Sequence, residues 1–228
     1  MKDEFVSVAS HELRTPMTAI KNYLWLVSKN NNAQHFQENK KFINIALNST
    51  DRLIAMVNDM LTISRIEGNR FELNKQKIDL NELADRVYND LLPMAENKKL
   101  SFLKKHSKKP LLIYADHGKI LEVMNNLVGN ALKFTASGRV ELNCYEFEDR
   151  AIFTVTDTGT GIDAADFPKL FKKFCRLENS YVKIKETGTG LGLYISKEIM
   201  DKHHGDISVT SQLGKGSTFT LSFPLKES

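Results

Sequence analysis

The first third of the chain carries two long stripes of apolar residues at helical spacing. Within each stripe, apolar positions recur at alternating steps of three and four, which is typical of a helix with one buried face. The first stripe comprises Val6, Leu13, Met17, Ile20, Leu24 and Val27, with Ser10 in phase; the second comprises Ile43, Leu47, Thr50, Ile54, Val57 and Leu61. We predict helices from Lys2 to Ser28 and from Phe36 to Ile66, with a polar turn at 30–32 and Gly68 as the final C-cap.

The predicted hairpin presents one broad apolar face that it cannot bury by itself. Two copies packed as a dimeric four-helix bundle would cover both stripes. The alternative is a monomeric hairpin that leans on the rest of the chain. Because the stripes are apolar along nearly their whole length, the sequence favours the homodimer.

Beyond residue 70 short strand patterns mix with helical ones. We predict strands at 71–74, 100–105, 111–114, 140–146, 151–156, 207–211 and 219–223, and helices at 80–97, 117–132 and 191–203. Asp79 suits the N-cap of the helix at 80–97, and Glu148-Asp149 suits a hairpin turn. Strands grouped with helices without regular alternation indicate an α+β layered sandwich. The predicted organisation is a helical hairpin at 1–67, a linker at 68–76 and an α/β sandwich domain at 77–228.

Composition narrows the class of protein without identifying it. The chain has 228 residues, 41% of them hydrophobic, and a net charge of +4, with no dense basic patch of the kind that binds nucleic acid. Cys144 and Cys175 form no CxxC pair, so a disulfide scaffold or zinc site is not indicated. No apolar run is long enough to cross a bilayer, and no signal peptide precedes the first helix. We therefore expect a cytoplasmic fragment, joined to any membrane only through upstream segments that are missing.

One polar residue beside the first stripe is a candidate catalytic group. His11 falls one step off the apolar seam, so its imidazole should face water, beside the carboxylate of Glu12. Thr15 lies one helical turn further along the same face, and Pro16 should loosen the helix there. A neutral imidazole is a nucleophile, and Glu12 could orient the ring and accept its proton. The alternative is an ordinary solvated histidine.

The helix predicted at 117–132 carries a polar face. Asn126, Asn130 and Lys133 lie at i, i+4 and i+7 and therefore share that face. Two amides and an ammonium suit a magnesium–triphosphate, because Mg²⁺ prefers hard oxygen ligands. The alternative is a solvated polar surface.

Three glycine-rich stretches follow, at 157–162, 188–193 and 214–219. Asp157 directly follows a predicted strand and could accept the amino group of adenine, while the glycines let backbone approach the base. The stretch at 188–193 opens a predicted helix, whose N-terminal amides favour phosphate. Each stretch alone could be a simple turn, and none matches a P-loop or a Rossmann fingerprint.

Together these motifs resemble a known family. The string FVSVASHELRTP at 5–16 resembles the H-box of sensor histidine kinases of two-component systems. The stretch beginning at Asn126 and the three glycine stretches resemble, in order, the N, G1, G2 and G3 boxes of the GHKL ATPase superfamily, and 171–176 resembles the F box. Nearly the whole chain is covered. The departures are small: Cys175 stands where an aromatic is common, and Asp163 where proline is common.

The resemblance implies a function and a set of roles. ATP would phosphorylate His11, and the phosphoryl group would pass to an aspartate of a response regulator. Asn130 would coordinate Mg²⁺, Lys133 and Arg176 would contact phosphates, and 178–187 would form a lid. Relatives that also dephosphorylate their regulator resemble this chain at Glu12 and Thr15. The remaining nucleotide contacts would come from Asn126, Phe134, Asp157, Gly159, Gly161, Gly188, Gly190, Gly192 and Thr218.

Position 126 separates two subclasses of the superfamily. Gyrase-type ATPases have a water-activating glutamate four residues before the metal asparagine, whereas this chain has Asn126. An amide is not a general base at neutral pH, so the site should hold ATP for an external nucleophile, His11. The rival functions are an ATP-hydrolysing machine, which Asn126 opposes, and a non-catalytic scaffold, which the intact motifs oppose.

Overall fold

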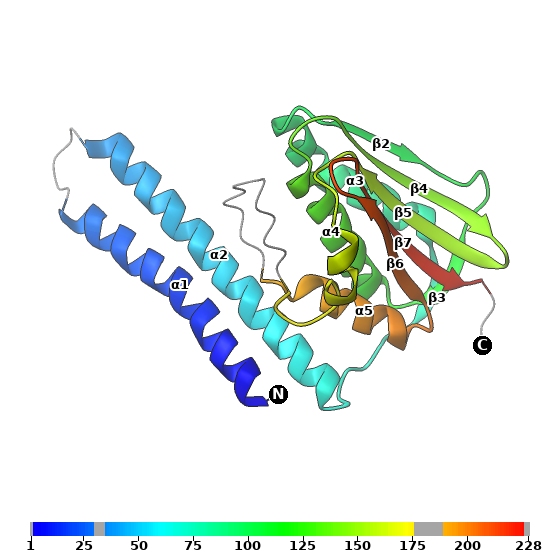
Figure 1. Ribbon diagram of the computed structural model, residues 1–228, viewed down its shortest axis with the longest axis horizontal. Helices are drawn as coiled ribbons and strands as arrows, with labels where there is room; N and C mark the ends of the chain where they lie inside the picture. The colour runs from blue at the N-terminus through cyan, green and yellow to red at the C-terminus, as the bar shows by residue number, and fades with distance from the viewer. Residues whose placement is uncertain (1, 30–34, 176–188, 226–228) are drawn as a thin grey trace. The chain divides into compact units, whose positions relative to one another are not determined.

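The computed structural model describes residues 2–29, 35–175 and 189–225, and the chain divides into two compact units, 1–70 and 71–228. Figure 1 shows the helices and strands of each unit. The boundary falls inside the segment 68–76 that the sequence assigned to a linker. Among the described helices, none is both long enough and apolar enough to cross a membrane.

The first unit is a hairpin of two long helices. Helix α1 runs from Lys2 to Lys29 and helix α2 from Phe36 to Glu67, within one residue of the predicted bounds. The rings of Tyr23 and Phe42 contact each other across the pair, with centroids 5.6 Å apart. Gly68 caps α2 by donating its N–H to the Ser64 carbonyl, 3.0 Å away. The predicted turn at 30–32 lies outside the described residues.

Apolar side chains remain on the surface of this hairpin. Those that are at least two-fifths exposed and belong to the predicted stripes are Met17, Leu24, Ile43, Leu47, Ile54, Val57 and Leu61. Soluble monomers rarely leave so long an apolar stripe in water. The stripes predicted from the sequence are therefore still uncovered in the single chain.

The second unit is a two-layer α/β sandwich, as predicted. Three helices, α3, α4 and α5, lie against one face of a five-stranded sheet in the order β2-β4-β5-β7-β6 (Figure 1). Strands β2 and β4 are parallel and the other neighbours are antiparallel, while β1 and β3 form a separate antiparallel pair. The bounds are β1 Gln76–Asp79, α3 Leu80–Asn97, β2 Ser101–Lys105, β3 Leu112–Ala115, α4 His117–Phe134, β4 Arg139–Phe147, β5 Arg150–Asp157, α5 Gly192–Lys202, β6 Asp206–Gln212 and β7 Gly216–Pro224.

The core of the second unit follows from strand alternation. On β4, β5 and β7, apolar side chains at every second position are fully or almost fully buried beneath the helices over most of each strand. The buried apolar set is Val140, Leu142, Cys144, Ala151, Phe153, Val155, Phe219, Leu221 and Phe223. The alternate positions on β5 and β7 are mostly threonine or serine, so the opposite face of the sheet is polar.

Two local predictions are confirmed and one is wrong. The Asp79 side chain accepts the Asn81 N–H and begins α3, and Glu148 and Asp149 both have positive φ, at 48° and 60°, in the β4–β5 turn. The strand predicted at 71–74 does not form. There the Asn74 N–H donates to the Asp116 carboxylate at 2.9 Å, and pairing with β3 begins only at Gln76. A 3₁₀ turn at Ala164–Lys169 was not predicted.

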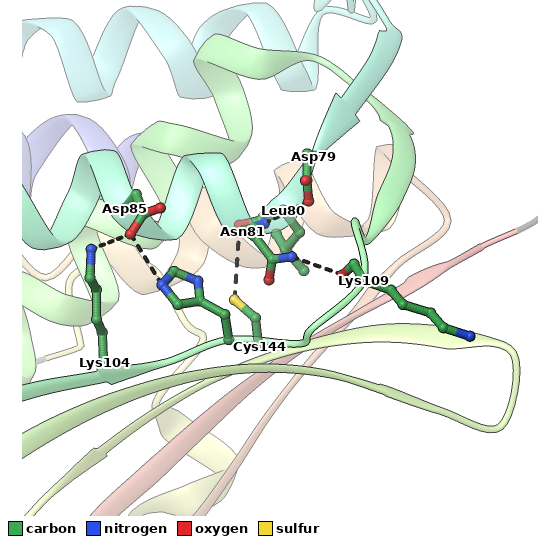
Figure 2. A network of polar contacts seen from close by, with 8 residues as sticks. Asp79, Leu80, Asn81, Asp85, Lys104, Lys109 and Cys144 are labelled. Atoms are coloured by element: carbon green, nitrogen blue, oxygen red, sulfur yellow. Dashed lines mark hydrogen bonds and ion pairs between the residues drawn. The ribbon is translucent and has the colours of Figure 1, made fainter.

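A polar network ties α3 to the sheet (Figure 2). The Asp85 carboxylate forms an ion pair with Lys104, and Nε2 of His106 lies 3.2 Å from the same carboxylate. The Asn81 amide donates to the Lys109 carbonyl at 3.0 Å, and the Cys144 thiol donates to the Leu80 carbonyl at 3.9 Å. Burial raises the pKa of Cys144 to about 12, so this cysteine is a protonated core residue.

A buried histidine joins the ends of α4 and α5. The Asp116 N–H, at the start of α4, donates to Nε2 of His203 at 3.0 Å, while Nδ1 lies 2.7 Å from the Ile199 carbonyl. Burial lowers the pKa of His203, which fits a neutral ring that accepts at Nε2 and donates at Nδ1. The two helices that carry the predicted nucleotide residues are thus connected at their far ends.

Candidate functional site

The first part of the site is built at the end of β5. Asp157 is buried, and one of its carboxylate oxygens accepts the Gly159 N–H at 2.8 Å. Burial raises the pKa of Asp157, although hydrogen bonds from the backbone of Gly159 and Ser217 oppose that shift. A carboxylate kept largely out of water is a strong and selective acceptor for an N–H donor such as an exocyclic amine.

Glycines at two positions allow backbone segments to approach one another closely near Asp157. Gly216 has φ +108°, and a Cβ there would lie 1.9 Å from the Asp157 carbonyl oxygen. Gly161 has φ +66°, and its Cβ would lie 2.1 Å from the Gln212 oxygen. The Gly214 N–H also donates to the Thr160 carbonyl at 2.7 Å. The first and third glycine stretches therefore pack so closely that no side chain could be accommodated at Gly161 or Gly216.

The structure does not bring Thr218 to this carboxylate. Its hydroxyl lies 3.0 Å from that of Thr156, its cross-strand neighbour. Thr156 directly precedes Asp157, so the pair points to the opposite face of the sheet. Ser217 lies on the Asp157 side instead, where it is buried and its hydroxyl lies 2.9 Å from that of Ser211. The sequence analysis missed Ser217, although alternation with the core residue Phe219 could have placed it.

The second part of the site lies where α4 meets α5. Asn126 and Asn130 are one turn apart on α4, and the Asn130 amide nitrogen lies 3.5 Å from the Asn126 oxygen. The Asn126 nitrogen donates to the Ser196 hydroxyl on α5 at 2.9 Å. A Cβ on Gly192 would stand 2.5 Å from the Asn126 oxygen. Ser196 is a further residue that the sequence analysis did not select.

Helix α4 joins the two parts. At its end, the Phe134 carbonyl oxygen lies so close to Gly159 that a Cβ there would be 2.5 Å away. The Lys133 ammonium stands over the Phe134 ring, 5.1 Å from its centroid. Gly190, with φ +71°, packs against Phe174, whose carbonyl carbon would be 2.8 Å from an added Cβ. Arg176, Gly188 and the predicted lid at 178–187 lie outside the described residues.

The donor set suits a cation that is held mainly by phosphate. In the described part of the chain, no group of three or more His, Cys, Asp or Glu residues could hold a metal ion. The amide oxygen of Asn130 is a hard ligand, and Mg²⁺ commonly takes only one or two protein oxygens together with substrate phosphates and water. The residues present therefore fit a magnesium ion that arrives with a nucleotide.

The histidine site is on the first unit. The His11 side chain is 75% exposed, and its Nδ1 lies 3.8 Å from the Glu12 carboxylate, which is only 17% exposed. The Thr15 hydroxyl lies 3.4 Å from the His11 carbonyl oxygen. A shallow groove on this face is lined by His11, Arg14, Thr15 and Thr18. Because Glu12 faces Nδ1, Nε2 is the ring nitrogen left for an incoming group.

Comparison with known proteins agrees with both halves of this description. Residues 1–69 match the family model of the His Kinase A (phospho-acceptor) domain, and residues 115–227 match that of the histidine kinase-, DNA gyrase B- and HSP90-like ATPases. The fold and the glycine-rich site thus define the second unit as an ATPase domain of that type.

The relatives identify the combination of the two domains. The chain is 34% identical to the sensor histidine kinase WalK of Bacillus subtilis, covering 98% of this chain and 37% of WalK. It is 33% identical to the autoinducer 2 sensor kinase/phosphatase LuxQ of Vibrio vulnificus, covering 98% of this chain and 26% of LuxQ. The chain belongs to the sensor histidine kinases of two-component systems, and it spans about a quarter to two-fifths of the length of such relatives.

Solved structures show the same fold. The histidine kinase AdeS of Acinetobacter baumannii superposes with a TM-score of 0.76 at 25% identity, covering 95% of this chain and 98% of AdeS. The kinase ThkA, solved in complex with the response regulator TrrA, gives 0.75 at 25% identity, covering 98% of this chain and 61% of ThkA. Full-length ShkA, solved in complex with AMPPNP, gives 0.72 at 27% identity, covering 97% of this chain and 45% of ShkA.

Because burial raises the pKa of Asp157, the stability of the fold should depend on pH. The contribution of such a carboxyl to the free energy of unfolding is fully present below its unfolded pKa and is lost as pH rises through its folded pKa. The variant Asp157→Asn stays neutral and can still accept the Gly159 N–H. We expect its melting temperature in calorimetry to exceed that of the wild type at pH 7, with the gap closing as pH falls toward about 4. An Asp157→Asn variant less stable than wild type at pH 7 would contradict the assigned burial cost.

Proposed function

We propose that this chain is the catalytic core of a sensor histidine kinase that transfers the γ-phosphoryl group of ATP to His11 and then to an aspartate of a response regulator. The observation that carries the proposal is the exposed His11 imidazole with the Glu12 carboxylate 3.8 Å from Nδ1, in a chain that also contains the ATPase domain. ATP as the donor places the reaction in the cytoplasm.

The chemistry at His11 follows from this geometry. The Nε2 lone pair attacks the γ-phosphorus, an N–P bond forms, and the bond to the bridging oxygen breaks as ADP leaves. The ring would then be positively charged, and the Nδ1 proton passes to or is shared with Glu12. Glu12 is only 17% exposed and its carboxylate lies 3.8 Å from Nδ1, so it is the group placed to take this proton.

The second unit would hold and orient ATP. Asp157 accepts the adenine amino group, Phe134 packs beside the base, and Lys133 and Arg176 contact phosphates. Asn130 supplies an oxygen to Mg²⁺, which neutralises phosphate charge when bound. The close packing of Gly159 and Gly216 against Asp157 supports the first of these roles.

The arrangement around Asn126 favours phosphoryl transfer to His11 over hydrolysis. Its amide nitrogen donates to Ser196 and its oxygen faces Asn130, so both ends of the group are occupied within the protein. An amide in this position does not take a proton from water. The γ-phosphoryl group is therefore left for the imidazole, which disfavours the rival ATP-hydrolysing machine.

The regulator and the dimer complete the proposal. The ThkA structure contains a response regulator, and LuxQ is a kinase/phosphatase by name, which supports a receiver-domain partner and a second, phosphatase activity here. The uncovered stripes on α1 and α2, with Ile54 54% exposed, support a homodimeric four-helix bundle.

His11→Gln tests the central role directly. Glutamine cannot form a phosphoramidate, so incubation with γ-labelled ATP should leave no acid-labile, base-stable label on the protein. ATP binding should stay within about twofold of wild type, because His11 is on a different unit from the nucleotide residues. Label that persists in His11→Gln would show that another residue is the acceptor.

Ile54→Glu tests the assembly. A carboxylate at this position of the bundle seam would be buried without a partner and would cost several kcal/mol. We expect the variant to sediment as a monomer under conditions where the wild type is a dimer. Lys40→Glu, at an exposed polar position of the same helix, is the matched control and should remain dimeric. A monomeric wild type at micromolar concentration would refute the bundle.

Thr15→Ala separates the two activities. The Thr15 hydroxyl is one turn beyond His11 and can hold a water near a phosphorylated regulator, whereas kinase chemistry requires only the imidazole and Glu12. We expect most autophosphorylation to remain and most regulator dephosphorylation to be lost. The 3.4 Å contact with the His11 carbonyl offers a purely structural alternative, which equal loss of both activities would favour.

A further inference from the structure

The function described so far uses the buried hydroxyl of Ser196 only as the group that accepts from the Asn126 nitrogen. Ser196 is 2% exposed and lies on the inner side of α5 beside Ile195, Ile199 and Met200, which are all buried. A hydroxyl among apolar side chains costs free energy unless it is hydrogen-bonded. Its partner is the amide of Asn126, at 2.9 Å, on a different helix and 70 residues away in sequence.

The first turn of α5 holds this amide from two sides. Gly192 lies one turn before Ser196, and a Cβ on Gly192 would come within 2.5 Å of the Asn126 oxygen and 3.0 Å of its amide carbon. The glycine therefore makes room for the side chain of Asn126, and the serine hydroxyl accepts from its nitrogen, which is the end of the amide that faces α5. With the Asn126 nitrogen committed to Ser196, its oxygen is turned toward Asn130.

This orientation passes to Asn130. The Asn130 nitrogen lies 3.5 Å from the Asn126 oxygen, at the long end of hydrogen-bonding distance. Because the nitrogen of Asn130 is used in this way, the carboxamide oxygen is the end that remains for a cation. If the amide were reversed, an N–H donor would face the cation and would repel it.

We propose that Ser196 is a positioning residue for the magnesium–nucleotide site, acting through Asn126 to present the oxygen of Asn130. The inference rests on the proposed function, because Asn130 is the metal ligand there. Groups that orient a metal ligand from behind commonly change metal affinity by about tenfold to a hundredfold when they are removed. The relay also connects the glycine stretch that opens α5 with the amide that serves the metal.

The test measures ADP binding to the whole chain by calorimetry, once with saturating Mg²⁺ and once with EDTA. The ratio of the two dissociation constants is the magnesium gain. Ser196→Ala should reduce this gain about tenfold, with ADP affinity in EDTA within about twofold of wild type. Ser222→Ala is the matched control: it removes a half-buried hydroxyl on β7 that accepts from Arg150, and it should leave the gain unchanged.

A double-variant cycle distinguishes positioning from general loosening. In an Asn130→Ala background, Ser196→Ala should cause no further loss of the magnesium gain, because the group it orients is absent. If Ser196→Ala fails to fold, Asn126→Ala removes the middle of the relay and should lose the gain in the same way. The inference would be overturned if Ser196→Ala or Asn126→Ala kept the full magnesium gain, or if ADP binding weakened equally with and without Mg²⁺. A wild type that shows no magnesium gain would instead contradict the proposed function.

Discussion

The nucleotide side of this molecule depends on the close approach of helix α4 to two glycine-rich stretches. At one end, the Phe134 carbonyl lies against Gly159, and in the middle the Asn126 amide lies against Gly192, both at distances that exclude a side chain. The sheet fixes the first contact, because Asp157 is the last residue of β5 and Gly159 lies two residues beyond it. The buried His203 fixes the far ends of α4 and α5. Residues from the end of β5 and from α5 therefore meet along one helix, α4.

Stability is given up at the point where function requires it. A leucine or asparagine at the end of β5 would avoid the cost of burying the carboxylate of Asp157, which burial shifts toward its protonated form. Ser196 and Asn126 likewise place polar groups between two apolar helix faces. Such groups are poor choices for packing but good ones for orienting a ligand, because each is held by a specific partner. In the proposed dimer, the exposed apolar stripes of α1 and α2 serve assembly in the same sense.

The sequence predicts much of this molecule wherever the signal is local. The helices of the hairpin, the Asp79 cap and the Glu148-Asp149 turn all follow from spacing or backbone preference. The strand at 71–74 failed because alternation alone does not supply a pairing partner, and its backbone binds the Asp116 side chain instead. Thr218 was selected from the motif and Ser217 was not considered, whereas the alternation set by Phe219 puts Ser217 on the side of Asp157. The contact between Asn126 and Ser196 could not be predicted, since nothing local links residues that are 70 positions apart.

We propose that the site protects ATP from hydrolysis and keeps the γ-phosphoryl group for His11. Asn126, which donates to Ser196 and faces Asn130, supplies no base, and in the proposed function the closely packed glycine backbone beside Asp157 holds the nucleotide. The most direct test is a single turnover with γ-labelled ATP in which ADP, protein-bound label and free phosphate are all counted. We expect each ADP formed to be matched by one label on protein, with free phosphate appearing only later as the phosphohistidine decays. Free phosphate that appears together with ADP, at the same rate in wild type and in His11→Gln, would contradict it.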